Sequence, residues 1–317
     1  MSVAAIVIGR NEGDRLLRCL ASLSGVADPI IYVDSGSEDG SVTVAETAGA
    51  VVVNLDMSHP FTAARARNAG LARLDEICVR PEFVQLVDGD CEIREGWIPA
   101  AEQFLEENPD VAFVTGRLRE RCPEASLWNR LADAEWNTPI GEVHAVGGIA
   151  MLRRQALAEE KGFRADLIAG EEPELCLRLR RRGWRIYRLD AEMAWHDIAM
   201  TRFSQWWKRC RRGGHAFAEG AFLHRAGPER YRRREVLRAL FWGLGVPGLA
   251  LLGMFFTPWA LGILLLWPLQ MQRLHLRGMS TPRAVFLVLG MLPEAQGVFE
   301  FHLSRIMGRQ RGIIEYK

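Results

Sequence analysis

The sequence predicts an α/β fold, with a doubly wound, mostly parallel sheet covered by helices on both faces, followed by a helical segment associated with a membrane. Short apolar runs alternate with helical patterns over roughly the first 120 residues, which is typical of βαβ units. Polar residues follow several of these runs, where the ends of parallel strands meet. Further along, no charged residue occurs between Arg238 and Arg273. These observations predict the sheet, a site at its edge and the membrane segment.

The first part of the chain is expected to contain five strands and four helices. The apolar runs that predict strands cover 4–8, 30–33, 50–55, 83–87 and 111–114. The helical patterns between them cover 14–23, 41–48, 62–74 and 98–108. The N-terminus lacks a basic segment and runs straight into the first strand, so we expect no signal peptide there.

The middle of the chain is less regular. Residues 120–145 are rich in Arg, Glu and Trp and are expected to form an excursion over one end of the sheet. Beyond them we expect strands at 148–152 and 184–189, and a helix at 203–220 that is basic and carries tryptophans. Another helix is expected to begin at Glu171-Glu172-Pro173, because proline favours the first turn.

The uncharged stretch 239–272 predicts a hydrophobic hairpin or a re-entrant pair of helices. One straight helix of this length would measure roughly 50 Å, against a hydrocarbon core of about 30 Å, and several glycines and prolines interrupt it. Arginines flank both ends, so the positive-inside rule places both ends on the cytoplasmic side. The alternative is a buried helical subdomain of a soluble protein.

We therefore divide the chain into an α/β domain at 1–225 and a helical, membrane-associated region at 226–317. Within the second region we expect an interfacial helix at about 284–303. The apolar run 284–292, which Pro293-Glu294 ends, is too short to span a bilayer. A basic tail follows, with Arg305, Arg309, Arg311 and Lys317.

The composition is that of a globular protein in a reducing cytoplasm. The hydrophobic share is 49% and the charged share 25%. The six cysteines form no C-x-x-C pair, which argues against a zinc site or a disulfide framework. The net charge of +1 gives no case for nucleic acid as a partner. The basic stretch 202–238 directly precedes the uncharged run, which favours anionic headgroups or a lipid pyrophosphate.

Polar side chains follow three predicted strands. Asp88-Gly89-Asp90 ends one, Asn11 and Glu12 follow another, and Asp34 follows a third. Alone, Asp-Gly-Asp is also ordinary turn chemistry. Because these strand ends lie side by side in a doubly wound sheet, we expect the polar groups to converge on one crevice. Convergent acids without a lysine favour a phosphate ligand bound through a divalent cation, and no P-loop or dinucleotide fingerprint occurs.

Taken together, the motifs of residues 3–225 resemble those of an inverting family 2 glycosyltransferase with the GT-A fold, of the bacterial membrane-associated type. The motifs that carry the resemblance occur in this order: Asn11-Glu12, Val33-Asp34-Ser35-Gly36-Ser37 with Asp39-Gly40-Ser41, Ala66-Arg67-Asn68-Ala69-Gly70, Asp88-Gly89-Asp90, Gly147-Gly148, and Gly170-Glu171-Glu172 followed by Leu177-Arg178-Leu179-Arg180.

The resemblance implies roles for the strand-end residues. Asp90, with Asp88 in support, would hold Mg²⁺ or Mn²⁺ beside the diphosphate of a nucleotide sugar, most commonly a UDP-sugar. Residues expected to contact this donor are Asn11, Glu12, Asp34, Arg67 and Asp88. Asp34 would bind the base and Glu12 the nucleoside. Arg67 has two possible roles, reaching the diphosphate or bracing the acids.

Inversion at the sugar carbon requires a base that takes the proton of the acceptor hydroxyl. The family places this base on the second acid of a Glu-Asp pair at a helix start, which corresponds to Glu172 here. A glutamate is one methylene longer than the family's aspartate, so the helix start or the acceptor must sit slightly further back. The alternative is that both acids simply favour a helix N-terminus.

The remaining site residues are assigned by the same resemblance. His196 follows the last expected strand, where related enzymes supply a third metal ligand, and imidazole suits Mn²⁺ better than Mg²⁺. A structural role beside a tryptophan is its alternative. Expected on the acceptor side are Gly147, Gly148, Glu171 and Trp206. Trp206 would equally suit a membrane interface.

The sequence thus predicts a non-processive, metal-dependent, inverting glycosyltransferase on the cytoplasmic face of the inner membrane. Its acceptor would be a hydroxyl of a lipid-linked glycan or of an envelope or extracellular polysaccharide. One alternative is a polyprenyl-phosphate glycosyltransferase. Another is a non-catalytic scaffold that retains the fold.

Overall fold

The computed structural model describes residues 3–308, and the chain forms two compact units. Unit 1 contains Met1–Leu167 and Glu171–Ala199, and unit 2 contains Ile168–Gly170 and Met200–Lys317. The sequence places this boundary at 225. The difference arises because helix α8 (Phe203–Leu223) packs along helix α13 (Met291–Ile306), and so belongs with the C-terminal helices.

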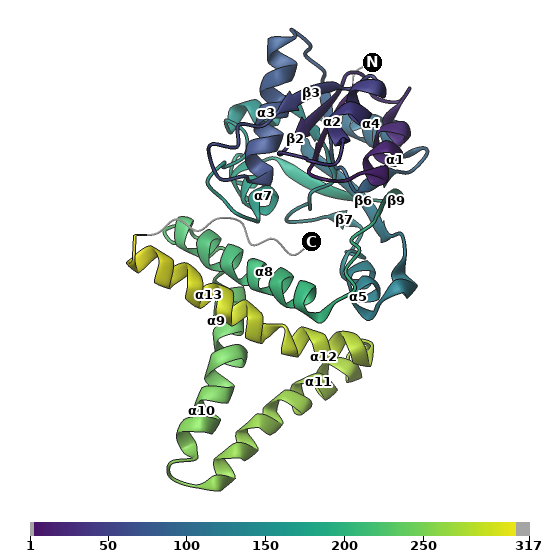
Figure 1. The fold of residues 1–317 in the computed structure, drawn as a ribbon. Helices are drawn as coiled ribbons and strands as arrows, with labels where there is room; N and C mark the ends of the chain where they lie inside the picture. The colour runs from purple at the N-terminus through teal and green to yellow at the C-terminus, as the bar shows by residue number, and fades with distance from the viewer. Residues whose placement is uncertain (1–2, 309–317) are drawn as a thin grey trace. The chain divides into compact units, whose positions relative to one another are not determined.

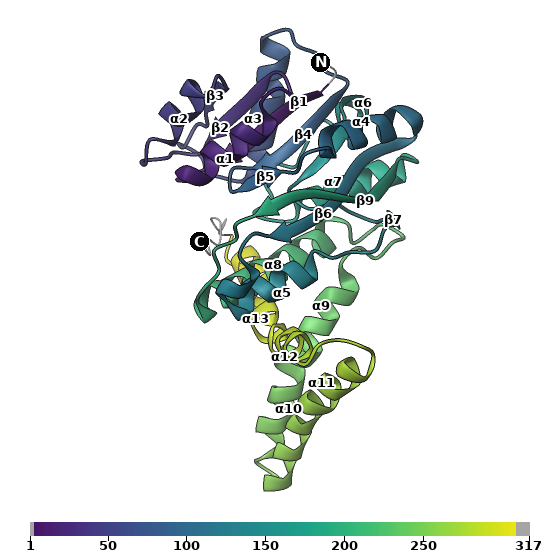
Figure 2. The same cartoon turned by 90° about the vertical axis from the view of Figure 1, so that its right-hand side faces the viewer.

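Unit 1 is built on a mixed, mostly parallel sheet (Figure 2), as the sequence predicts. The strand order is β3-β2-β1-β4-β8-β6-β9-β5, with β7 paired to β9. The strands β1 to β4 are parallel neighbours, β6 is parallel to β9, and β5, β7 and β8 pair antiparallel. Their bounds are β1 Val3–Gly9, β2 Ile30–Asp34, β3 Val51–Asn54, β4 Phe83–Asp88, β5 Cys91–Ile93, β6 Val111–Glu120, β7 Gly141–Glu142, β8 Ala150–Arg153 and β9 Arg185–His196.

Helices cover both faces of this sheet and bury two hydrophobic cores. Helices α1 and α4 bury apolar residues against one face, and α3, α6 and α7 against the other. In α1 the buried positions recur every three or four residues, as an amphipathic helix requires. The helical elements are α1 Asp14–Leu23, α2 Ser41–Thr47, α3 Ala63–Glu76, α4 Trp97–Glu107, η1 Pro123–Ala125, α5 Leu127–Glu135, α6 Arg154–Glu159 and α7 Glu171–Arg181.

The regular elements of unit 2 among the described residues are all helical. Figure 1 shows α10 running antiparallel to the η3–α11 stretch, so the apolar run 239–272 folds as a helical hairpin. The elements are α8, α9 Arg233–Leu240, the π-helical turn η2 Phe241–Gly245, α10 Val246–Gly253, the 3₁₀ stretch η3 Pro258–Leu265, α11 Leu266–Leu276, α12 Thr281–Leu289 and α13.

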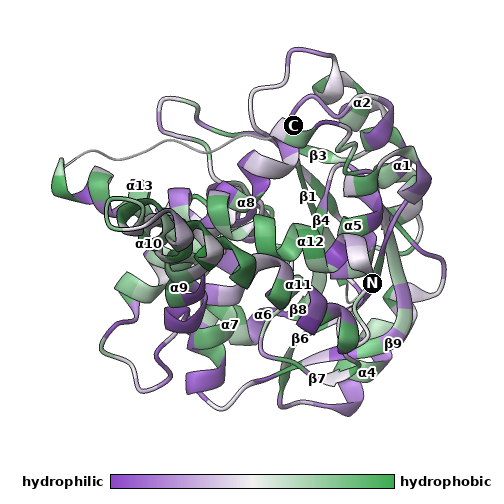
Figure 3. Cartoon of the chain, turned by 90° about the horizontal axis from the view of Figure 1, so that it is seen from below, coloured by the Kyte–Doolittle hydropathy of each residue, from purple (hydrophilic) through white to green (hydrophobic). Residues whose placement is uncertain are grey.

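Apolar side chains of the hairpin are widely exposed, and Figure 3 shows hydrophobic residues along its helices. Phe255, Phe256 and Trp259 at its tip are 87%, 91% and 89% exposed. Two stretches of unit 2 are long and apolar enough to cross a membrane by length and composition alone, Arg233–Gly253 and Thr281–Ile306.

The expected stop at Pro293-Glu294 is wrong. Helix α13 begins at Met291, which places Pro293 in its first turn, where the missing N–H costs no helical hydrogen bond. The apolar stretch is therefore longer than the sequence suggests. Of the expected basic tail, Arg305 lies in α13, whereas Arg309, Arg311 and Lys317 lie outside the described residues.

Helices α8 and α13 approach each other closely through two glycines. A Cβ atom on Gly214 would lie 2.0 Å from the Glu294 carbonyl oxygen, and one on Gly297 would lie 2.0 Å from the Arg211 carbonyl oxygen. Gly213, the neighbour of Gly214, has open space at its Cβ position. The helix pair therefore requires a glycine at 214 but not at 213.

We expect Gly214→Ala to destabilise unit 2 by about 1–3 kcal/mol, because the added methyl must push the two helices apart. Gly213→Ala is the matched control and should be neutral, or stabilising by up to about 1 kcal/mol, through its higher helix propensity. Thermal unfolding of the two detergent-purified variants measures the difference. Equal melting temperatures would contradict the close helix contact.

Candidate active site

A buried arginine joins three carboxylates at the edge of the sheet. Arg67, on α3, is only 2% exposed. Its Nη1 lies 2.7 Å from Oε1 of Glu171 and 2.8 Å from Oε1 of Glu172, and its Nη2 lies 3.1 Å from Oδ1 of Asp88. Of the two roles that the sequence leaves open for Arg67, the bracing of acids is the one that this geometry provides.

The elements around Arg67 fix this geometry. Helix α3 starts where the Thr62 side chain accepts a hydrogen bond from the backbone N–H of Arg65, 3.1 Å away. Helix α7 buries Leu175 and Leu179 in the core on the same sheet face, which holds its first turn, with Glu171, against Arg67. Asp88 ends β4.

The charges of this cluster shift the pKa values of Glu172 and Arg67. Burial raises the pKa of the Glu172 carboxyl to about 7, with the Glu171 charge adding to the effect and Arg67 opposing it. Burial works against the charge of Arg67, but the Glu172, Asp88 and Glu171 carboxylates together raise the pKa of its guanidinium. Near neutral pH, Glu172 is therefore able to hold or release a proton while Arg67 stays charged.

Gly148 closes the cluster from the side of β8. Its carbonyl oxygen accepts a hydrogen bond from Nη2 of Arg67 at 3.3 Å. A Cβ atom there would lie 2.7 Å from Oδ2 of Asp88 and 2.9 Å from Nη2 of Arg67, so a side chain would disrupt the pair. The Cβ position of Gly147 is open. The acceptor contacts expected of both glycines stay predictions.

A second group of ligand atoms assembles beside the first. Nε2 of His196 lies 3.1 Å from Oδ2 of Asp90, and the Cys91 thiol completes a set whose ligand atoms lie within 4.8 Å of one another. The chain reverses after Asp90, because β5 pairs antiparallel with the end of β9 and places Cys91 opposite His196. This pairing brings together residues 106 positions apart.

The irregular region 120–145 supports His196. The ring of Trp136, just after α5, stacks on the His196 imidazole with centroids 4.7 Å apart. Glu120, buried at the end of β6, accepts hydrogen bonds from the Asn129 side chain and from the backbone N–H of Ile198. The region therefore fixes the end of β9.

The ends of β1 and β2 form a hydrogen-bonded loop next to these groups. In the sheet register, Gly9 lies opposite Asp34 and Ile8 lies opposite Asp88. Asp34 accepts hydrogen bonds from the N–H groups of Gly36 and Ser37 and from the Tyr32 hydroxyl, at 2.8–2.9 Å. Its contact with a nucleotide base stays a prediction.

Asn11 and Glu12 are tied to the same edge. The backbone N–H of Asn11 donates to the Ser37 hydroxyl at 2.9 Å, and the Asn11 side chain accepts from the N–H of Glu38 at 2.8 Å. Glu12 pairs with Arg15 at 2.9 Å. The structure thus gathers the expected strand-end residues on one edge of the sheet.

Trp206 belongs to unit 2 and is 5% exposed. Its ring packs edge-on against Phe286, with centroids 5.3 Å apart, and also contacts Phe203. Its role as an acceptor contact stays a prediction. No local pattern in the sequence marks Cys91 as part of the ligand group or Trp136 as a support for His196.

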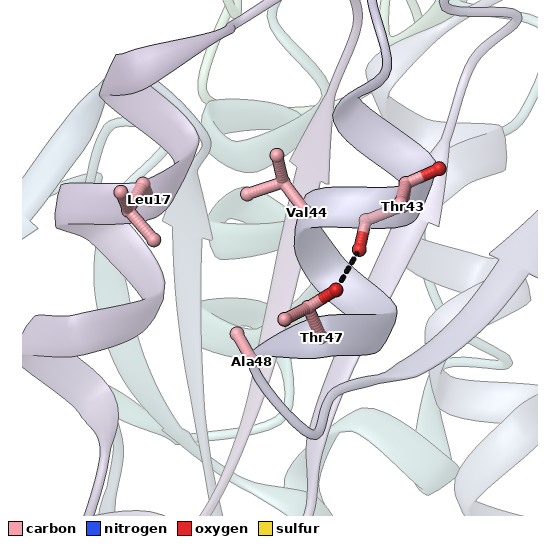
Figure 4. Close-up of a pocket in the computed structure, with 5 residues that line it drawn as sticks. All are labelled: Leu17, Thr43, Val44, Thr47 and Ala48. Carbon is pink, nitrogen blue, oxygen red and sulfur yellow. Dashed lines mark hydrogen bonds between the residues drawn. The ribbon is translucent and has the colours of Figure 1, made fainter.

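A shallow depression on the outer surface of α1 and α2 is separate from these groups. Figure 4 shows that it is lined by Leu17, Thr43, Val44, Thr47 and Ala48. The Thr47 hydroxyl is bonded to the Thr43 carbonyl oxygen at 2.8 Å. The depression contains no ionisable group and offers no catalytic chemistry.

Three comparisons with known proteins bear on identity. Residues 4–160 match the family model "Glycosyl transferase family 2". The chain is 29% identical over 217 residues to a pre-mycofactocin glycosyltransferase of Mycobacterium tuberculosis, covering 63% of this chain and 42% of that protein. It is 33% identical over 139 residues to a TPR repeat-containing protein of Synechococcus elongatus, covering 43% and 32%. The chain thus spans less than half the length of these curated relatives.

The fold matches that of a mannosyltransferase from Pyrobaculum calidifontis solved in complex with GDP-Man and Mn²⁺. The TM-score is 0.60 at 18% identity, covering 94% of this chain and 87% of that one. At this identity the likeness concerns the fold, and it confirms the α/β fold class predicted from the sequence. By the family match and the glycosyltransferase relative, residues 4–160 belong to glycosyl transferase family 2.

Proposed function

We propose that this protein transfers a sugar, with inversion, from a nucleotide sugar to a hydroxyl of a lipid-linked or polysaccharide acceptor, with a UDP-sugar as the expected donor. One observation carries the proposal: the Asp90–His196 pair and the Arg67-bound Glu172 lie at the same edge of the sheet. An inverting transfer needs a cation that stabilises the leaving diphosphate and a base that takes the acceptor proton. The metal-ligand pair would hold the cation, and a carboxyl with a pKa of about 7 would serve as the base.

The ligand group fits a divalent cation. Asp90 offers a carboxylate and His196 an imidazole, a combination that suits Mn²⁺. Burial raises the pKa of the Cys91 thiol well above its usual range, which leaves it protonated and a poor ligand. When bound by Asp90 and His196, with Asp88 in support, Mg²⁺ or Mn²⁺ would neutralise charge on the departing nucleoside diphosphate.

The chain's own residues supply the other requirements. Asp34 holds the loop after β2 in the shape expected to receive the base, since its carboxylate bonds two successive N–H groups. Glu172 accepts the proton of the acceptor hydroxyl as that oxygen attacks the sugar carbon. Arg67 fixes the carboxylate of Glu172 in place. A panel of nucleotide sugars, read by released nucleoside diphosphate, tests the activity. Release from none of them, with or without acceptor, would contradict it.

Replacing the proposed metal ligands should reduce donor turnover. We expect Asp90→Asn to lower Mn²⁺-dependent release of nucleoside diphosphate by roughly a hundredfold or more, because the ligand charge is lost. His196→Gln should lower it less, by roughly tenfold to a hundredfold. Electron paramagnetic resonance of free Mn²⁺ measures binding independently of turnover. Full Mn²⁺ binding by Asp90→Asn would refute the assignment.

The pH dependence of transfer should follow Glu172. Because the base must be ionised, the rate should rise with pH up to about 7 and fall roughly tenfold per unit below it. Glu171→Gln removes a negative charge that raises the pKa of Glu172, so the rising limb should move to lower pH. Initial rates over a pH series measure both profiles. An unmoved limb in Glu171→Gln would exclude Glu172 as the titrating group.

The same residue distinguishes the two acceptor classes. With a hydroxyl acceptor, Glu172→Gln should lower transfer by roughly 10²–10⁴-fold. A polyprenyl phosphate, the second candidate acceptor, carries no proton that must be removed, so the variant would retain substantial activity. A non-catalytic scaffold would release no nucleoside diphosphate at all.

We further propose that the exposed hairpin of unit 2 attaches the protein to the cytoplasmic face of the inner membrane. The supporting observation is the exposure of Phe255, Phe256 and Trp259 at one tip, since large apolar groups rarely gather in water without a partner. Tryptophan and phenylalanine are suited to the bilayer interface and core. The arginines Arg233, Arg234, Arg273 and Arg277 at the open end of the hairpin suit anionic headgroups.

Polar substitution of the hairpin tip should weaken membrane binding. Burying one phenylalanine side chain contributes about 1.5–3 kcal/mol, so Phe255→Ser with Phe256→Ser should lower vesicle binding roughly a hundredfold or more. Leu17→Ser, at an exposed apolar residue of unit 1, is the control and should bind as wild type. Sedimentation with vesicles containing anionic lipid measures the partition. Equal sedimentation of both variants would contradict attachment through this tip.

A further inference from the structure

Arg188 on β9 is a buried cation for which the described part of the chain supplies no ion-pair partner. It is 3% exposed, its Nε is buried without a hydrogen-bond partner, and its side chain makes no ion pair within residues 3–308. Buried guanidinium groups are normally compensated by carboxylates or carbonyl oxygens, because an uncompensated charge is costly to bury. Arg67, for example, is compensated by the carboxylate of Glu171.

A second arginine increases the positive charge beside Arg188. Arg117 on β6 is 6% exposed and pairs with Asp133 at 2.8 Å. Burial, and next the charge of Arg117, lower the pKa of Arg188. Asp190 and Glu192 act on it more weakly, and Glu192 is already bound by Arg119 at 3.0 Å. The surroundings of Arg188 therefore favour an added negative charge.

The strand places Arg188 on the sheet face that carries Glu172. Side chains alternate along β9, so Arg188 lies opposite in direction to Tyr187, which contacts Phe104 of α4. It shares its face with Ile186, which packs in the core beneath α7. Helix α7 packs against β9, and its first turn contains the proposed base, Glu172.

We propose that Arg188, with Arg117 beside it, binds an anionic group of the acceptor, a phosphate or a carboxylate. This inference deepens the proposed function and rests on it, since the acceptor is the ligand that must approach Glu172. The guanidinium offers a planar fork of donors that matches both anions. The acceptor would thus be recognised by a charge outside the hydroxyl that reacts.

Binding of a small anionic probe tests this site. The probe is phenyl phosphate, compared with the neutral phenyl β-glucoside, added to full-length detergent-purified protein with UDP and Mn²⁺ present to fill the proposed donor site. We expect calorimetric binding of the phosphate and not of the glucoside. Arg188→Met should weaken phosphate binding roughly tenfold or more, whereas Arg188→Lys should weaken it less. Arg185→Met, at an exposed arginine of the same strand, is the control and should bind as wild type.

Thermal unfolding without ligand provides a second readout. Arg188→Met should melt at or above the wild-type temperature, because an apolar side chain replaces an uncompensated buried charge. A lower melting temperature would mean that the guanidinium has a structural partner and would overturn the proposal. Wild-type phosphate affinity in Arg188→Met, or no phosphate binding by wild type, would overturn it as well.

The same measurements separate this proposal from the proposed function. Phosphate binding that depends on Arg188, in a protein that turns over no nucleotide sugar, would leave the anion site standing and remove the transferase activity. Donor turnover together with phosphate binding that does not depend on Arg188 would support the transferase activity and remove the anion site.

Discussion

Ionic groups are stable in a protein interior only when opposite charges compensate them, and the site around Arg67 is organised by this requirement. One guanidinium contacts three carboxylates, from β4 and from the first turn of α7. Removing one partner of a buried ion pair costs about 3–5 kcal/mol. Negative charge nevertheless exceeds positive charge in the cluster. Burial, with this excess of negative charge adding to it, raises the pKa of Glu172 to about 7.

A chain reversal complements this charge cluster. Because β5 follows Asp90 directly and runs back along β9, the histidine at the far end of β9 is placed against Asp90. Trp136 and Glu120 then hold that end of β9 from the side of β6. The carboxylate cluster and the carboxylate–imidazole pair are thus joined through Gly89, the one residue between Asp88 and Asp90. A change in one is expected to affect the other.

Local patterns predict the parts of unit 1 whose sequence periodicity reflects burial. The helix at 14–23 and the first residues of β2, β4 and β6 have the predicted positions, since each is an apolar run or an amphipathic repeat. The strand β5 and the outer half of β9 were not predicted, because their residues are mixed in polarity and are fixed only by pairing with each other. The bracing role of Arg67 depends on partners up to 105 positions away, which no local pattern contains. Pro293 was misjudged because proline stops a helix in its interior but is tolerated in its first turn.

Arg188 does not pair with the acids Glu172 and Asp88 in unit 1, and this separation has a chemical consequence. If Arg188 lay near Glu172 or Asp88, it would pair with them and become a structural cation like Arg67. Neither acid is among the groups that shift the pKa of Arg188. Glu172 and Asp88 therefore remain available to bind a proton or a metal cation. A bound cation can stabilise a leaving group whose negative charge increases as it departs. The arginines on β6 and β9 supply a fixed positive charge, which suits a ligand whose charge does not change during the reaction. A transferase that handles two anionic ligands would gain from this division, because each ligand is attracted by a different kind of positive charge.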